Sequence, residues 1–126
     1  MIFGRKKLAQ RIDGRRWSAV ESTLERGERP LHNTPAVFMD VDGMDWQGIC
    51  YLTDKAILGD EAGSLRPSTW RLPLNEVTSF ELRGYRLGVR SHHEIHVIQL
   101  YPSPPTDQLL VSFLALMKEQ VHVERI

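Results

Sequence analysis

The sequence has only one cysteine, Cys50, so no intramolecular disulfide can stabilise the chain. Cys50 lies in an apolar run that predicts a strand, and we expect it to be a buried core thiol. A net charge is also missing, because sixteen basic residues balance sixteen acidic ones. This balance gives no support to a whole-molecule attraction to nucleic acid or anionic lipid, and we expect no nucleic-acid partner.

Long hydrophobic runs are absent as well. The longest apolar stretch, residues 109–117, is interrupted by Ser112 and is far shorter than the ~20 residues that span a bilayer. The opening residues MIFGRKKLAQRID lack the apolar run that follows the basic residues of a secretion signal. We therefore expect a cytoplasmic protein, or one held peripherally at the inner face of the membrane.

Recognisable catalytic patterns are the third absence. The sequence contains no nucleophile elbow, phosphate loop or paired-carboxylate arrangement. We therefore expect no enzyme activity, no catalytic residues and no cofactor. Five histidines and scattered acids leave one alternative open, since catalytic groups often meet only in three dimensions.

What is present suits one soluble domain. The chain has 126 residues, of which 41% are hydrophobic and 25% charged, values typical of a globular protein with a modest single core. We divide it into an N-terminal arm and helix, residues 1–27, and one domain, residues 28–126.

The first sixteen residues, which we call the basic arm, carry a local charge of +5. Its cations are Arg5, Lys6, Lys7, Arg11, Arg15 and Arg16. Such a cluster predicts salt-sensitive attachment to an anionic membrane surface, and Ile2 and Phe3 could insert. A solvated tail or an ordinary helix is the alternative.

A helix is predicted after the basic arm. Ser18 and Glu21 have the spacing of a capping box, and Gly27 supplies a stop signal. Trp17, Val20 and Leu24 fall on one face, so this helix should pack against an apolar surface.

From Gly27 onward the pattern changes to strands. Asp42-Gly43 is a strong hairpin signal, Thr53-Asp54-Lys55 reads as a turn, and residues 59–67 read as a polar loop. The predicted strands are 36–41, 46–52, 56–58, 68–74, 77–83, 85–90 and 94–101. Alternation of strands with turns predicts a bent antiparallel sheet, or a partly open barrel, of about seven strands.

A closing helix is predicted over residues 106–120. Thr106 is a suitable N-cap, and Asp107 complements the helix dipole in the first turn. Apolar residues recur every three or four positions: Leu109, Leu110, Phe113, Leu114, Met117 and Val121. This stripe is wide enough to cap one end of the sheet. The fold class is therefore mainly β (α+β).

Three short segments resemble a known family. Residues 24–29 (LERGER), 47–58 (QGICYLTDKAIL) and 71–77 (RLPLNEV) resemble the opening, the central hairpin and the following step of GRAM domains, which belong to the PH-like superfamily. The resemblance covers roughly residues 24–121. A lipocalin-like or other small barrel would show many of the same alternations.

The resemblance implies a non-catalytic binding module, because such domains generally engage lipid head groups, peptides or proteins. Phosphoinositide-binding PH domains usually place Lys and Arg in the loop between the first two strands. This chain has Asp40, Asp42 and Asp45 there. We therefore expect these aspartates to bind basic protein partners, or a membrane-associated complex, and to disfavour phosphorylated lipids. The expected docking surface is an exposed sheet edge or the face next to the terminal helix.

One alternative function stays open. On a strand, His92, Glu94 and His96 would share one face and could bind a transition metal. The protein would then be a small ligand-binding or metal-dependent barrel. Otherwise these residues form an exposed polar strand face.

Overall fold

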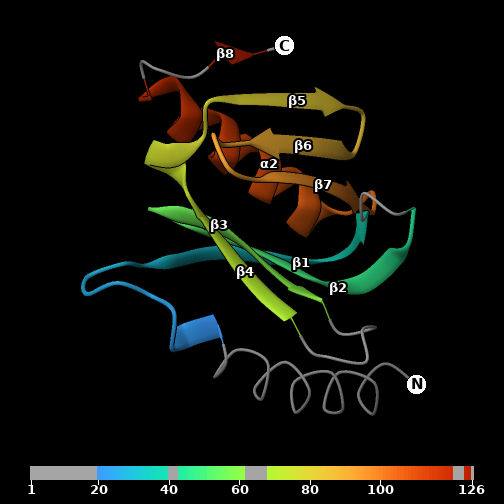
Figure 1. Ribbon diagram of the computed structural model, residues 1–126, viewed down its shortest axis with the longest axis horizontal. Helices are drawn as coiled ribbons and strands as arrows, with labels where there is room; N and C mark the ends of the chain where they lie inside the picture. Colours follow the sequence, from blue (N-terminus) through green and yellow to red (C-terminus); the bar gives the residue numbers. More distant parts are fainter. Residues whose placement is uncertain (1–19, 40–42, 62–67, 121–123, 126) are drawn as a thin grey trace.

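The computed structural model describes residues 20–39, 43–61, 68–120 and 124–125. Within them lie eight strands, a 3-10 helix and one long helix (Figure 1). The strands are β1 (Pro30–Met39), β2 (Asp45–Thr53), β3 (Ala56–Glu61), β4 (Ser68–Pro73), β5 (Ser79–Arg83), β6 (Arg86–Arg90), β7 (Ile95–Leu100) and β8 (Glu124–Arg125). The helices are η1 (Leu74–Glu76) and α2 (Pro104–Lys118).

All eight strands belong to one sheet, in the order β4-β3-β2-β1-β7-β6-β5-β8. Strands β1 to β7 pair antiparallel, and only β8 pairs parallel, with β5. The sheet bends, so β1–β4 cross the lower part of Figure 1 and β5–β7 the upper part, with α2 behind them. The predicted fold, a bent antiparallel sheet of seven strands followed by one helix, is confirmed.

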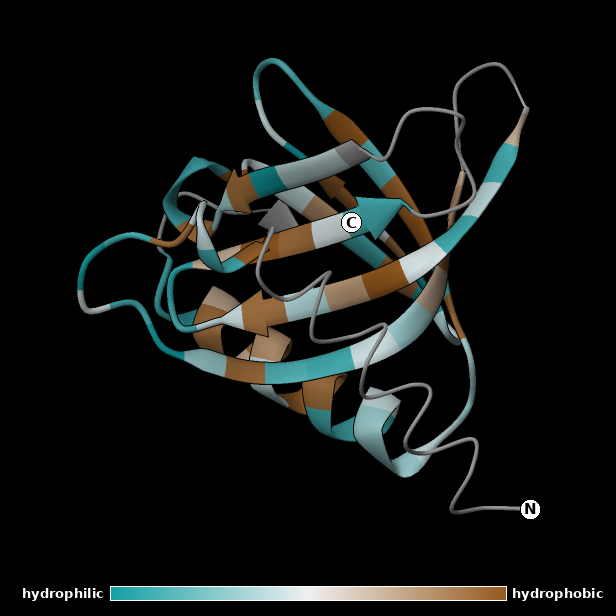
Figure 2. Cartoon of the chain, turned by 90° about the horizontal axis from the view of Figure 1, so that it is seen from below, coloured by the Kyte–Doolittle hydropathy of each residue, from teal (hydrophilic) through white to brown (hydrophobic). Residues whose placement is uncertain are grey.

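The main core lies between the inner face of the sheet and α2. The helix buries Leu109, Leu110, Phe113 and Met117. Phe113 is fully buried, and its ring meets that of Phe80 edge-on, with centroids 5.3 Å apart. Figure 2 shows the matching alternation of hydrophobic and hydrophilic residues along several strands. This alternation is why the sequence folds as a half-buried sheet.

A second, smaller cluster covers the opposite face of β2 and β3. Val20 is fully buried there with Ile49, Tyr51, Ala56 and Leu58, and Leu24 packs against them. Val20 and Leu24 therefore meet an apolar surface as predicted, but the predicted helix does not continue to Gly27: its described part ends at Glu21 and turns follow. Its predicted capping residue, Ser18, lies outside the described residues.

The first strand was predicted to begin at residue 36, and this boundary is wrong. β1 begins at Pro30 and includes Pro35. Among the described strands, β7 pairs with β1 only over Ala36–Met39, so the first half of β1 has one described neighbour, β2. Proline lacks an N–H, and a strand with one unpaired side tolerates that loss.

The predicted loop at residues 59–67 begins too early. β3 continues to Glu61, with Gly59 opposite Trp70 of β4. A Cβ on Gly59 would lie 2.3 Å from the Trp70 ring, and one on Gly48 would lie 1.9 Å from the Asp60 carbonyl oxygen. Both glycines therefore mark close approach inside the sheet, where the sequence suggested a turn signal at Gly59.

The start of the closing helix also differs from the prediction. α2 begins at Pro104, and Ser103, rather than Thr106, is its N-cap and accepts a hydrogen bond from the Thr106 N–H. Pro104 and Pro105 fit the first turn because the N–H groups there need no partner in the helix. Thr106 is buried, and its hydroxyl lies 2.8 Å from that of Thr34.

Cys50 is fully buried, as predicted, and burial raises the pKa of its thiol to about 12. In the described part of the chain, no helix is long and apolar enough to cross a membrane.

Candidate binding surfaces

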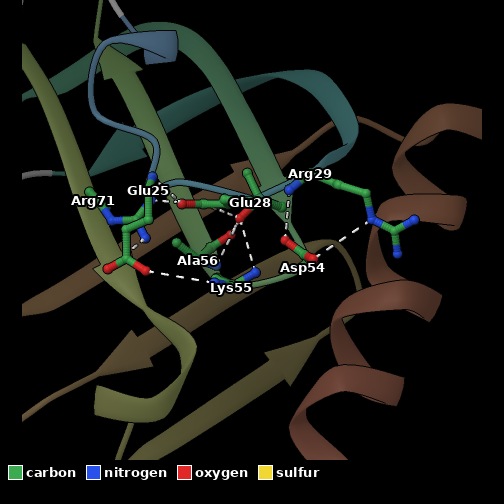
Figure 3. Close-up of polar contacts among 8 residues, drawn as sticks. Glu25, Glu28, Arg29, Asp54, Lys55, Ala56 and Arg71 are labelled. Carbon is green, nitrogen blue, oxygen red and sulfur yellow. Dashed lines mark hydrogen bonds and ion pairs between the residues drawn. The ribbon is translucent and has the colours of Figure 1, made fainter.

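Glu28, just before β1, is the centre of a buried polar cluster (Figure 3). Its side chain has no exposed area. One carboxylate oxygen accepts hydrogen bonds from Arg71 Nη1, at 2.8 Å, and from the Thr53 hydroxyl. The other oxygen accepts from the Glu25 backbone N–H at 2.9 Å. Glu28 therefore accepts hydrogen bonds from Thr53 of β2, from Arg71 of β4 and from Glu25 in its own turn.

The charge of Glu28 is stabilised by these donors. Burial by itself raises the pKa of the carboxyl, but the hydrogen bonds from Arg71, Thr53 and the Glu25 amide outweigh it and leave the pKa below its usual value. Glu28 and Arg71 therefore form a buried ion pair at neutral pH.

The neighbouring turn is bonded to the same segment. The Arg29 N–H donates to Asp54 Oδ1 at 2.8 Å, and the Asp54 N–H donates to the Arg29 carbonyl oxygen at 3.0 Å. The Thr53 hydroxyl accepts from the N–H of Ala56 at 2.9 Å. The predicted turn at Thr53-Asp54-Lys55 is thus present and is joined to the segment before β1.

The three short segments noted above meet at these contacts. Glu28, Thr53 and Arg71 come from residues 24–29, 47–58 and 71–77, and they meet in one bonded group. The side chains join the lead-in segment to the β2–β3 hairpin and to β4. The three segments are therefore joined by a buried polar cluster.

The histidine group predicted to share a strand face is only partly assembled. His96 Nε2 lies 3.0 Å from Glu94 Oε2, and the His96 ring stacks on Trp70 with centroids 3.7 Å apart. His92 lies before β7, which begins at Ile95, so strand alternation does not place it beside the other two. Among the described residues, no group of three or more His, Cys, Asp or Glu side chains could hold a metal ion.

His92 and His93 instead line a hollow of about 380 Å³ together with Glu94, Arg71 and Thr78. Positive and negative side chains are mixed in this hollow. The arrangement does not favour one ligand charge.

The predicted acidic and basic contact residues lie mostly outside the described residues. Of the three aspartates, only Asp45 is described, as the exposed first residue of β2, opposite Met39. Asp40 and Asp42 lie outside, as do Arg5, Lys6, Lys7, Arg11, Arg15 and Arg16 of the basic arm. Gly43 has φ +80°, which suits the predicted hairpin turn.

A different surface is formed by β5, β6 and β7, on the side facing away from α2. We call it the arginine face. Its residues follow from the register and alternate with the core positions Leu87 and Val89: Glu81, Arg83, Arg86, Gly88, Arg90, Ile95 and Val97. It carries three arginines and one glutamate, so its charge is positive.

Gly88 lies at the middle of the arginine face, between Glu81 of β5 and Val97 of β7. A hollow of about 300 Å³ is lined by these three residues with Arg83 and Arg86. A second hollow of about 160 Å³ shares Glu81, Gly88 and Val97 and extends to Ile95, which is 55% exposed. The face thus offers an apolar floor bordered by guanidinium groups.

Nothing in the described residues requires glycine at position 88. Its φ is not left-handed, and an added Cβ would meet only the Glu81 carbonyl oxygen, at 4.0 Å. Glycine within a strand destabilises it by roughly 0.5–1 kcal/mol relative to alanine. A glycine without an internal steric reason is typical of a place where another molecule approaches the backbone. The signal in the sequence was Gly88 between the alternating Leu87 and Val89, and our sequence analysis missed it.

Known structures share this architecture. The C-terminal domain of an unknown protein from Leishmania infantum matches with a TM-score of 0.60 and 14% identity, over 87% of this chain and 98% of that chain. The N-terminal PH domain of human ARAP2 matches with a TM-score of 0.55 and 12% identity, over 79% of this chain and 88% of that one. The chain has a PH-like fold.

A larger protein also contains this PH-like fold. The DH/PH domains of PDZ-RhoGEF, solved in complex with activated RhoA, match with a TM-score of 0.59 and 10% identity, over 83% of this chain but only 34% of that one. No family model and no curated protein matches the sequence.

Proposed function

We propose that this protein is a GRAM-like, non-catalytic interaction module that docks onto a protein partner through the arginine face. The observation that carries the proposal is Gly88, a strand glycine with open space above it and arginines around it. The module acts in the cytoplasm, alone or within a complex at the inner face of the membrane.

The chemistry of the arginine face defines the partner. Arg83 is paired with Glu81, and Arg86 Nε donates to Gln99 at 3.2 Å, so each of these guanidinium groups has one partner on the surface. The planar guanidinium of arginine suits bidentate contact with carboxylates. Exposed Ile95 and the bare backbone at Gly88 suit an apolar side chain between those carboxylates. The partner segment is therefore acidic, with one inserted apolar residue.

Two further considerations support a protein partner. The DH/PH protein that shares this fold was solved bound to another protein, RhoA. The acidic hairpin, with Asp45 as its described member, provides a contact of opposite sign. We propose that Asp40, Asp42 and Asp45 bind basic residues of the same partner, because a protein surface can present both charges whereas an anionic membrane cannot.

A photo-cross-linking experiment tests the docking surface. With benzoyl-phenylalanine in place of Ile95, a 55% exposed position of the arginine face, we expect a defined protein adduct in cells of the source organism, because the probe lies beside Gly88 and leaves the backbone there bare. The same probe at Val111, a 68% exposed position of α2, is the matched control. Gly88→Phe and Arg86→Glu should each weaken binding of the captured protein at least tenfold. Equal adducts at both positions, or full binding by both variants, would contradict the proposal.

The basic arm is proposed as a second, electrostatic attachment to an anionic membrane. Near an acidic membrane each cation contributes about 1 kcal/mol, so removing residues 1–16 should abolish most sedimentation with phosphatidylserine liposomes at low salt. The measurement compares the full chain with residues 17–126 at two salt concentrations. Equal sedimentation of both forms would exclude this role for the arm.

A further inference from the structure

The free edge of β5 continues the arginine face. β6 pairs with one side of β5, and on the other side β8 pairs only with Ser79 and Phe80. No described strand pairs with Glu81, Leu82 and Arg83 on that side. A strand edge with unpaired N–H and C=O groups is a template for another extended chain.

β8, the strand that pairs with this edge of β5, is weakly held. β8 has two residues, and it is the one parallel neighbour in a sheet that is otherwise antiparallel over the described strands. Parallel pairing is slightly less stable per residue than antiparallel pairing. A longer antiparallel segment could therefore pair along all five residues of β5 and form more backbone hydrogen bonds.

We propose that an extended, acidic segment of the protein partner pairs with β5 in place of β8, so that β8 is a built-in competitor for the binding edge. This inference rests on the proposed function and specifies how the partner binds. It assigns the partner an extended conformation, which the arginine face alone does not.

The register indicates the chemistry of the incoming segment. Glu124 of β8 lies opposite Ser79, in the row that continues to Arg90 and Ile95. On the same face of β5, Glu81 lies opposite Gly88 of β6, and Arg83 lies opposite Arg86 of β6. Because alternate residues of a strand point to the same side, a segment along Ser79–Arg83 brings two or three side chains to the arginine face.

The opposite edge of the sheet, β4, is less suited to this role. Arg71 of β4 is committed to Glu28, and the strand ends at Pro73. The β5 edge alone adjoins Gly88 and the three arginines.

The test uses the chain's own tail as the probe. A synthetic peptide of residues 119–126 is titrated into isotope-labelled chain 1–120, in which α2 is intact, and into the full chain. We expect the backbone amide signals of Ser79–Arg83 to shift in chain 1–120. If the tail covers the edge nine-tenths of the time, binding to the full chain is about tenfold weaker. Absence of these shifts at millimolar peptide would overturn the inference.

A second variant separates the loss of β8 pairing from other effects of removing residues 121–126. Glu124→Pro in the full chain removes one N–H and disfavours strand pairing, so it should bind the peptide as chain 1–120 does. The protein captured at position 95 should bind chain 1–120 and Glu124→Pro about tenfold more tightly than the full chain. If Gly88→Phe blocks that protein but neither tail change alters its affinity, docking on the arginine face holds and displacement of β8 is wrong. If the peptide binds β5 but position 95 captures nothing, the proposed function fails by itself.

Discussion

Phe113→Ala is expected to lower the free energy of unfolding by roughly 3–5 kcal/mol. Phe113 lies at the centre of α2 with no exposed area, and its ring contacts Phe80 edge-on across the helix–sheet interface. Alanine would leave a cavity that the surrounding strands cannot fill, because they are fixed by their hydrogen-bonded neighbours. Thermal unfolding should shift down by roughly 10–20 °C for a chain of this size.

Val111→Ala is the matched control on the same helix. Val111 is 68% exposed, and alanine has the higher helix propensity, so stability should stay unchanged or rise by a few tenths of a kcal/mol, about the difference in propensity. Urea unfolding followed by circular dichroism measures both variants. Equal midpoints for Phe113→Ala and the wild type would mean that α2 does not close the core.

The sequence predicted the fold well where periodicity and turn chemistry agree. The stripe through Leu109 and Phe113 predicted a helix packed against the sheet, and the break at Thr53-Asp54-Lys55 predicted a turn; both are present. Boundaries failed where a tertiary contact overrode a local signal. Gly59 reads as a loop residue, yet it is a strand residue because Trp70 occupies the space that its Cβ would take.

The candidate surfaces were harder to predict, for a related reason. The sequence drew attention to charged and histidine residues close together along the chain, such as His92, Glu94 and His96. The arginine face is assembled from three strands, and no short segment contains it. β8 could not be predicted either, because a two-residue strand has no period and depends on the edge that it meets.

Glu28 lies in one of the segments that resemble GRAM domains, but the sequence gives no sign of the partner of its side chain. Only the fold reveals that Arg71, distant in sequence, lies 2.8 Å from its carboxylate. This pair gives the second large expected effect.

Glu28→Ala is expected to destabilise the protein by about 3–5 kcal/mol, because it leaves Arg71 largely buried without its closest partner. Glu25 lies 3.8 Å from Arg71 Nη2 and can compensate only in part, since its own side chain is 61% exposed. Replacing both residues, Glu28→Met with Arg71→Met, removes the unpaired charge and should cost less than the sum of the two single changes. The coupling from this double-mutant cycle should be about 1–3 kcal/mol.

The same pair should make stability depend on pH in a defined direction. The folded pKa of Glu28 lies below its usual value because the donors from Arg71, Thr53 and Glu25 outweigh burial. As the pH falls, Glu28 is therefore protonated first in the unfolded chain, where its pKa is about 4.3. The stabilisation is fully present above that pH and is lost as the pH falls through the folded pKa. Urea unfolding between pH 7 and pH 3 should show a difference between the wild type and Glu28→Gln that shrinks as the pH falls, whereas a constant difference would mean that the charge of Glu28 contributes nothing.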